Sequence, residues 1–305
     1  MQDYQITFVE PWLFNQKLEF EQNLYHRELN YVSRVFDERR TGTRSGLRKT
    51  LGSDFLIGGV SYTLENIGIF NVDPDASEFF KSQEGDALIS RLGTSLSYDT
   101  RGAGFLPSTG QLTRARAEIA GGPLGAEVDL YKLELTTKHY FRGLGKGHII
   151  ELLAEAGVTD IYGNTQNLPL YDRWWLGGLR NLRGFRFRDV GPKDQFGEPI
   201  GGSTYWIGSA EYSIPIIDRL RFAVFYDIGM VYQDPYSFDS KVMDPLTGNS
   251  LILDTGTYND NFGFGVRMNL PIGPLRLDYG IPMTTDEQND GSGRFNFGVG
   301  WERPF

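Results

Sequence analysis

Several segments of this chain alternate apolar residues with polar or small ones at a period of two. In residues 294–301 every odd position is apolar, and every even position is small or polar. Residues 219–232, 258–270 and 274–283 repeat the pattern. Successive side chains of a strand point to opposite faces, so the alternation predicts strands with one apolar and one polar face. The chain is therefore predicted to be all-β.

The same reading extends along the whole chain and predicts about thirteen strands. They fall near residues 2–10, 17–27, 41–51, 55–65, 86–100, 111–120, 127–140, 147–157, 203–214, 219–232, 258–270, 274–283 and 293–303. Long connections at 66–85, 158–202 and 233–257 alternate with short ones. Strands of about ten residues with short turns at one rim and long loops at the other are typical of transmembrane barrels. A soluble β-sandwich or a lipocalin-like barrel shows the same alternation and stays open as an alternative.

Composition narrows the functional classes. The chain has no Cys, which excludes disulfides and thiolate metal sites, and its net charge of -9 without a basic stripe argues against a nucleic-acid partner. The three histidines, His26, His139 and His148, lack metal-ligand spacing and adjacent nucleophiles. We therefore expect no enzyme activity and no cofactor.

The long connection at 158–202 carries the most unusual local sequence. It contains Trp174-Trp175 and, further on, the run Leu182-Arg183-Gly184-Phe185. The planar guanidinium of Arg183 can hold two carboxylates, Gly184 permits a sharp turn, and Phe185 can pack against a sheet. The alternative is a solvated arginine in a mobile loop. Asp172 and Arg173 are expected, with the two tryptophans, to pack the loop onto the rim.

This loop and its strands resemble the BamA-type outer-membrane assembly factors of the BamA/TamA superfamily, in which a plug loop bears Val-Arg-Gly-Phe. Further matching stretches are 225–229, 271–282 and 294–300. The resemblance implies that Arg183 pairs with lumenal carboxylates at the positions of Glu211 and Asp227. The alternation independently places both carboxylates on the polar face of their strands.

The resemblance also implies a fold and a function for residues 1–305. The fold is an antiparallel transmembrane β-barrel with about thirteen of the family's roughly sixteen strands and a plug loop at about 158–202. Upstream POTRA domains and the first strands would be absent, so the sheet should be open between Tyr4–Val9 and Phe295–Trp301. The implied activity is insertion of unfolded β-barrel proteins into a bacterial outer membrane, through a lateral seam. Partners would be those substrates, outer-membrane lipid and assembly lipoproteins held by the POTRA domains.

The last strand resembles the gate strand and assembly signal of outer-membrane proteins. The residues concerned are Phe295, Phe297, Val299, Gly300, Trp301 and Phe305. Pro304 cannot donate a ladder hydrogen bond, so strand pairing should stop before it. Two other functions stay open: a TamA-like or two-partner secretion transporter of the same superfamily, and a passive porin that conducts ions steadily.

Overall fold

The structure is a computed structural model that describes residues 2–29, 35–102, 106–243, 250–254, 258–270, 273–286, 289 and 291–299. Thirteen strands form one antiparallel sheet, and each pairs with the next along the chain, apart from an inserted hairpin. The sheet strands are β1 (Gln2–Glu10), β2 (Leu18–Leu29), β3 (Asp37–Thr50), β4 (Leu56–Phe70), β5 (Gly85–Asp99), β6 (Gly110–Ala120), β7 (Leu130–Arg142), β8 (Ile149–Ile161), β9 (Thr204–Ile217), β10 (Leu220–Tyr232), β13 (Asn259–Leu270), β14 (Gly273–Thr284) and β15 (Arg294–Val299). The predicted all-β class and the thirteen predicted strands are confirmed.

The sheet curls around a polar interior. On β13, Phe262 and Phe264 are exposed, while Asn261 and Arg267 on the other face of the strand are buried. The apolar faces predicted from the alternation lie outward: Val224, Phe262, Phe264, Phe295 and Phe297 are exposed, and Leu220, Phe222, Leu275 and Leu277 are partly so. Apolar residues outside and polar residues inside are the arrangement of a membrane barrel, so the soluble alternative is wrong.

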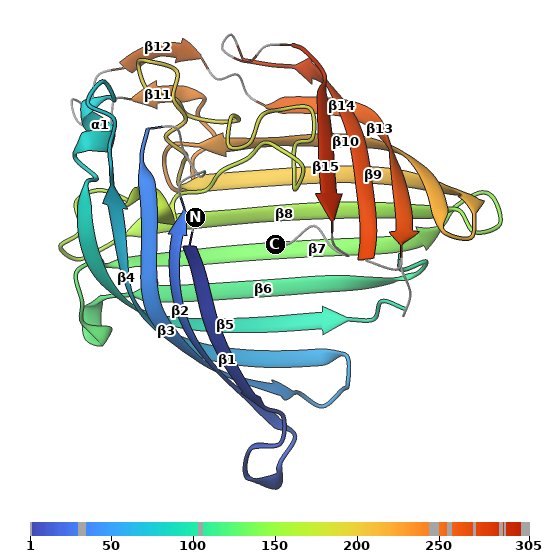
Figure 1. Cartoon of the computed structure of the whole chain (residues 1–305), viewed down its shortest axis with the longest axis horizontal. Helices are drawn as coiled ribbons and strands as arrows, with labels where there is room; N and C mark the ends of the chain where they lie inside the picture. The colour runs from blue at the N-terminus through green and yellow to red at the C-terminus, as the bar shows by residue number, and fades with distance from the viewer. Residues whose placement is uncertain are drawn as a thin grey trace.

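The two edges of the sheet are β1 and β15, and no pairing joins them among the described residues. Figure 1 shows these strands, dark blue and dark red, at the two ends of the curved sheet. The predicted opening between the first and last segments is confirmed. It leaves two unpaired backbone edges, which are the parts of a sheet that can accept another strand.

The connections alternate in length as predicted. Short turns join β3 to β4, β7 to β8 and β9 to β10, whereas residues 71–84, 162–203 and 233–258 form long connections. The first of these contains the helix α1 (Glu78–Lys81), and the last contains a hairpin that the sequence analysis missed, β11 (Lys241–Met243) with β12 (Ser250–Asp254). Single-turn 3-10 helices lie at η1 (Leu13–Asn15), η2 (Gly122–Leu124) and η3 (Leu170–Asp172). No described helix is long and apolar enough to cross a membrane.

The connection between β8 and β9 lies within the curve of the sheet (Figure 1) and supplies much of the core. Its residues Leu182, Phe185 and Val190 pack against Ile207 of β9 and Val231 of β10. Full burial of each such side chain contributes about 1.5–3 kcal/mol. The loop is therefore packed inside the sheet as a plug and does not extend into solvent.

Candidate functional site: the lumenal loop and its ion pairs

Two glycines set the path of the loop before Arg183. Gly177 and Gly178 have φ of 114° and 98°, values that other residues adopt at a cost. The backbone N–H of Gly177 donates to Oδ1 of Asn181 at 2.7 Å, and that of Gly178 donates to the Leu182 carbonyl at 3.0 Å. This tight turn directs the next residue, Arg183, toward the wall of the sheet.

Arg183 is fully buried and binds Asp227 of β10 through two parallel hydrogen bonds. Its Nε donates to Oδ2 and its Nη2 to Oδ1, each at 2.7 Å. Asp227 also accepts from the hydroxyl of Ser209 at 2.6 Å and from the amide of Asn261 at 3.1 Å. The guanidinium carbon lies 3.4 Å from the centroid of the Phe225 ring. Such a planar, bidentate and stacked site suits arginine and not lysine.

Glu211 of β9 is the second partner, and it belongs to a larger network. Nη1 of Arg183 donates to its Oε2 at 2.7 Å. Glu211 also accepts from Nε and Nη2 of Arg267, at 3.1 and 2.8 Å, and lies 3.4 Å from Nη2 of Arg276. Both of these arginines bind Asp278 of β14. Three arginines thus face three carboxylates, Asp227 included, and the buried charges balance.

The structure places Arg183, Glu211 and Asp227 together, with the carboxylates on adjacent antiparallel strands. The alternative of a solvated arginine is therefore wrong. The sequence analysis missed the part played by Arg267, Arg276 and Asp278. Their alternation already put them on the polar face, but sequence spacing does not reveal which polar residues of different strands meet.

Gly184 serves a purpose other than the predicted sharp turn. It is not among the glycines with positive φ. Instead, a Cβ there would lie 2.6 Å from Cβ of Asn261 and 3.1 Å from the backbone nitrogen of Pro282. On β14, a Cβ at Gly280 would lie 2.7 Å from the carbonyl carbon of Arg183 in the loop. Glycine is needed at both positions because the loop backbone lies directly on β13 and β14. Phe185 packs in the plug as expected and is 3% exposed.

A second ion-pair cluster holds the start of the loop. Asp172, expected at the rim, is instead buried against the inner wall, where both its oxygens accept from Arg91 of β5 at 2.8 and 2.7 Å. Lys132 of β7 lies 3.4 Å away, and Glu65 of β4 lies 3.4 Å from Arg91. Burial opposes ionisation of Asp172, but the charges of Arg91 and Lys132 outweigh it and hold the pKa of this carboxyl below its usual range.

Of the other residues expected to pack the loop onto the rim, Arg173 is buried and Trp174 and Trp175 are partly buried. Arg173 donates to the carbonyls of Leu168 and Ile200 at 3.2 and 3.3 Å. Burial lowers the pKa of Arg173 to about 10. Trp174 packs on Tyr205 of β9 with ring centroids 4.6 Å apart. Gly201, with φ of 63°, lies where the loop returns to the sheet.

The loop also contacts the last hairpin of the sheet. The amide of Asn296 on β15 donates to the carbonyl of Arg183 at 2.7 Å. Between β14 and β15, Asn289 donates to the Asp189 carbonyl at 3.3 Å, and Asp286 lies 3.6 Å from the ammonium of Lys193. The edge strand β15 is thus held from inside by the plug, a connection that the sequence did not indicate.

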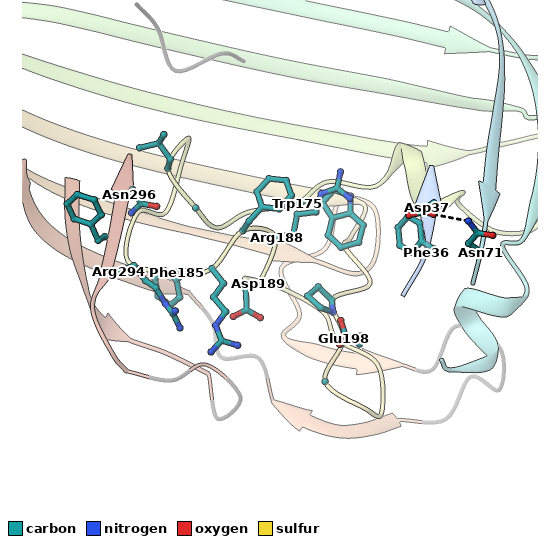
Figure 2. A pocket seen from close by; sticks show the side chains of 17 residues that line it. Phe36, Asp37, Asn71, Trp175, Phe185, Arg188, Asp189, Glu198, Arg294 and Asn296 are labelled. Carbon is teal, nitrogen blue, oxygen red and sulfur yellow. Dashed lines mark hydrogen bonds between the residues drawn. The ribbon is translucent and has the colours of Figure 1, made fainter. Parts of the chain in front are cut away.

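A cavity of about 1180 Å³ lies between the loop and the edge of the sheet. Figure 2 shows Arg188 and Asp189 of the loop lining it together with Arg294 and Asn296 of β15. The lining carries charges of both signs and does not form a metal site, because no group of three His, Asp or Glu side chains meets among the described residues.

The predicted gate-strand residues divide into two groups. Phe295, Phe297 and Val299 are exposed on the outward face of β15, at 67%, 57% and 64%. Gly300, Trp301 and Phe305 lie outside the described residues.

An antiparallel sheet with an apolar outer face, a polar lumen and an arginine-bearing plug defines a transmembrane β-barrel protein. The chain belongs to the Omp85 superfamily domain family, whose model matches residues 1–302.

Two curated relatives show how much of a longer protein this chain corresponds to. It is 28% identical over 248 residues to the outer membrane protein assembly factor BamA of Nitratidesulfovibrio vulgaris, covering 79% of this chain and 29% of that protein. It is 26% identical over 217 residues to the sorting and assembly machinery component 50 homolog A of Xenopus laevis, covering 70% and 44%. The chain thus spans less than half the length of either relative.

Solved structures show the same fold. The crystal structure of BamA from Haemophilus ducreyi lacking POTRA domains 1-3 matches with a TM-score of 0.79 and 16% identity, over 97% of this chain and 61% of that one. CdiB from Acinetobacter baumannii matches with a TM-score of 0.57 and 13% identity, over 97% and 49%. The fold is therefore that of a BamA-type barrel.

Proposed function

We propose that this chain is the barrel of a factor that assembles and inserts β-barrel proteins in a bacterial outer membrane. The membership in the Omp85 superfamily and the relatives named as assembly factors support assembly as the activity. The observation that carries the proposal is the buried Arg183 network, which ties the plug to β9, β10, β13 and β14. A passive pore needs no such fixed plug.

The proposed mechanism uses strand edges and no cofactor. An unpaired edge such as that of β15 offers backbone donors and acceptors to an incoming strand, so it can template a substrate strand. Lipid tolerates no unpaired backbone, so a substrate strand paired at the edge is stabilised in the membrane. The plug holds β15 from inside through Asn296 and so keeps the edge in a defined position during this exchange.

The second candidate is a transporter of the same superfamily, which would share this barrel fold. The two functions differ in their consequence for other membrane proteins. An assembly factor raises the level of folded outer-membrane proteins in general, whereas a secretion transporter affects its own exported partner only. Both use the same fold, so the choice between them rests on a cellular measurement.

The cellular test is depletion of the native protein and complementation with Arg183→Ala, within the complete gene product. We expect lower levels of folded porins while the variant barrel itself still migrates as a folded, heat-modifiable species. Arg180→Ala, an exposed arginine in the same loop, is the control and should behave as wild type. Normal porin levels with a folded Arg183→Ala barrel would contradict a role of this network in assembly.

A further inference from the structure

An apolar groove of about 760 Å³ lies on the outward face of strands β5 to β9. Its floor contains side chains that lie in register across these five strands. Ala115 of β6 lies between Leu96 and Leu135, and Ala156 of β8 lies between Leu135 and Trp206. The short alanine side chains leave the surface low between the larger leucine and tryptophan side chains.

The segment after β10 folds back over one end of this groove. Tyr236 and Phe238 line it from above. The hydroxyls of Tyr236 and Tyr131 lie 3.0 Å apart, and the backbone N–H of Tyr236 donates to the Thr204 hydroxyl at 2.8 Å. The ring of Phe238 contacts that of Tyr232 edge-on, with centroids 5.4 Å apart. The aromatic lid is therefore fixed to β7, β9 and β10.

The lid is held at some conformational cost. Tyr236 has a φ of 56°, in the left-handed region that bulky residues avoid. Such a conformation is unfavourable for a bulky side chain and persists only where surrounding contacts determine it. Its hydrogen bonds to Thr204 and Tyr131 supply those contacts. They hold two aromatic rings, both more than half exposed, over an apolar groove instead of burying them.

We propose that this groove binds one acyl chain of a lipid from the surrounding bilayer. The groove is continuous with the outward apolar face, which meets lipid hydrocarbon in a membrane barrel. It also lies beside the long connection at 233–258, and the tyrosine hydroxyls stand at this end, as amphipathic rings do at a membrane interface. The fit is to a flexible apolar chain that enters from the bilayer.

A peptide fits the groove less well than an acyl chain. The backbone groups of β5 to β9 are already paired with one another in the sheet. A peptide lying across them would keep its own N–H and C=O groups unpaired in an apolar environment, at several kcal/mol per group. A hydrocarbon chain carries no such groups, so the floor of alanine and leucine can accept it without that penalty.

The test uses the membrane-embedded full chain in nanodiscs that contain phosphatidylethanolamine with a diazirine in its acyl chain. After photolysis, mass spectrometry locates the label. We expect the label to concentrate on peptides that contain Ala156 and Phe238, above the level on other outward surfaces such as that around Leu24. Ala156→Phe fills the floor and should reduce the groove label to that background level. Tyr236→Ala removes the lid hydroxyl and ring without changing a strand, and should also reduce it.

The control is Leu24→Phe, an outward substitution on β2 far from the groove, which should leave the groove label unchanged. Heat-modifiability of each variant shows that the barrel is folded. The proposal is overturned if wild-type label on the groove equals that around Leu24, or if folded Ala156→Phe retains the full groove label. If Ala156→Phe does not fold, retention of the full label by Tyr236→Ala overturns it instead.

Discussion

Asp227 is the carboxylate that depends most on Arg183. Glu211 also binds Arg267 and Arg276, whereas Asp227 is bound by Arg183 through two parallel hydrogen bonds and also accepts from the neutral donors Ser209 and Asn261. Loss of the loop arginine therefore removes the bidentate cationic partner of Asp227. Burying a charge without its counter-ion costs free energy, whereas burying a neutral side chain of the same shape at that position does not carry this cost.

This asymmetry predicts that Asp227→Asn partly rescues Arg183→Ala. The single Arg183→Ala change should weaken loop docking by about 3–5 kcal/mol, because it removes the bidentate cationic partner of the buried Asp227. The double variant should recover part of that loss, since an amide needs no counter-ion. Cleavage of the loop by proteinase K measures docking, and Arg180→Ala is the matched control. Equal cleavage of the single and double variants would show that Asp227 is not the stranded charge.

The close approach at Gly280 gives a second residue-level prediction. A Cβ there lies 2.7 Å from backbone atoms of the loop, so Gly280→Ala should displace the loop at a cost of about 1–3 kcal/mol, in line with overpacking elsewhere. The β14 ladder should persist, because its own hydrogen bonds are unchanged. Gly46→Ala on β3, where the nearest atom is 3.9 Å away, is the control and should not alter protease protection of the loop. Full protection in Gly280→Ala would mean that the contact is not tight.

The ion pairs that hold the plug loop as an element include those of Arg183 and those of the Asp172 cluster. The lowered pKa of Asp172 predicts how the second anchor responds to pH. A carboxyl with a lowered folded-state pKa adds stability that is complete above its unfolded pKa of about 4, and that is lost as the pH falls through the lower folded value. The anchor should thus persist at neutral and mildly acidic pH.

Asp172→Asn tests this anchor. The variant should expose the start of the loop to protease at pH 7, because Arg91 and Lys132 lose their common partner. The difference from wild type should shrink as the pH falls below about 4, because the carboxyl of the undocked loop is protonated there while the docked one, with its lowered pKa, is still ionised, so the ion pair stabilises docking progressively less. A difference that is constant over this range would show that the charge of Asp172 does not anchor the loop.

The two edge strands are held differently. Asn296 ties β15 to the plug, whereas the side-chain partners of β1 within the described residues lie on β1 itself, in the turn that follows it or on β2. Asn296→Ala should therefore speed amide hydrogen exchange in β15 several-fold, in keeping with about 1 kcal/mol for a lost hydrogen bond. Exchange in β1 of the same sample is the internal control and should not change. Equal acceleration of both edges would point to general loosening of the barrel.

The strands could be predicted because the alternation of apolar and polar residues within each strand already distinguishes its two faces. The alternation of Phe262 and Phe264 with small and polar neighbours needs no knowledge of other strands. The hairpin β11–β12 was missed because its strands are short and lie inside a long connection. The Asp172–Arg91 pair was missed because its partners are 81 residues apart and meet only when the loop folds into the lumen. Asp172 alone looks like an ordinary loop residue.

Across the whole molecule, charge is placed inside and apolar surface outside. Two groups of paired buried charges, one at Arg183 and one at Asp172, bind the same loop to the wall. The family resemblance predicted Glu211 and Asp227 as the partners of Arg183, and the alternation predicted which face of each strand is polar. Which inward residues meet was set by strand register, which the sequence does not state. The molecule is thus a barrel wall whose plug reaches from the β5 side to the last strand.

The most direct test of the proposed function is assembly in a defined system. Proteoliposomes containing the complete gene product would be given an unfolded outer-membrane β-barrel protein, and its heat-modifiable folded form would be measured over time. We expect wild type and Arg180→Ala to accelerate folding above empty liposomes, and Arg183→Ala, although itself folded, to do so much more slowly. Equal rates for liposomes with and without the wild-type protein would contradict the account.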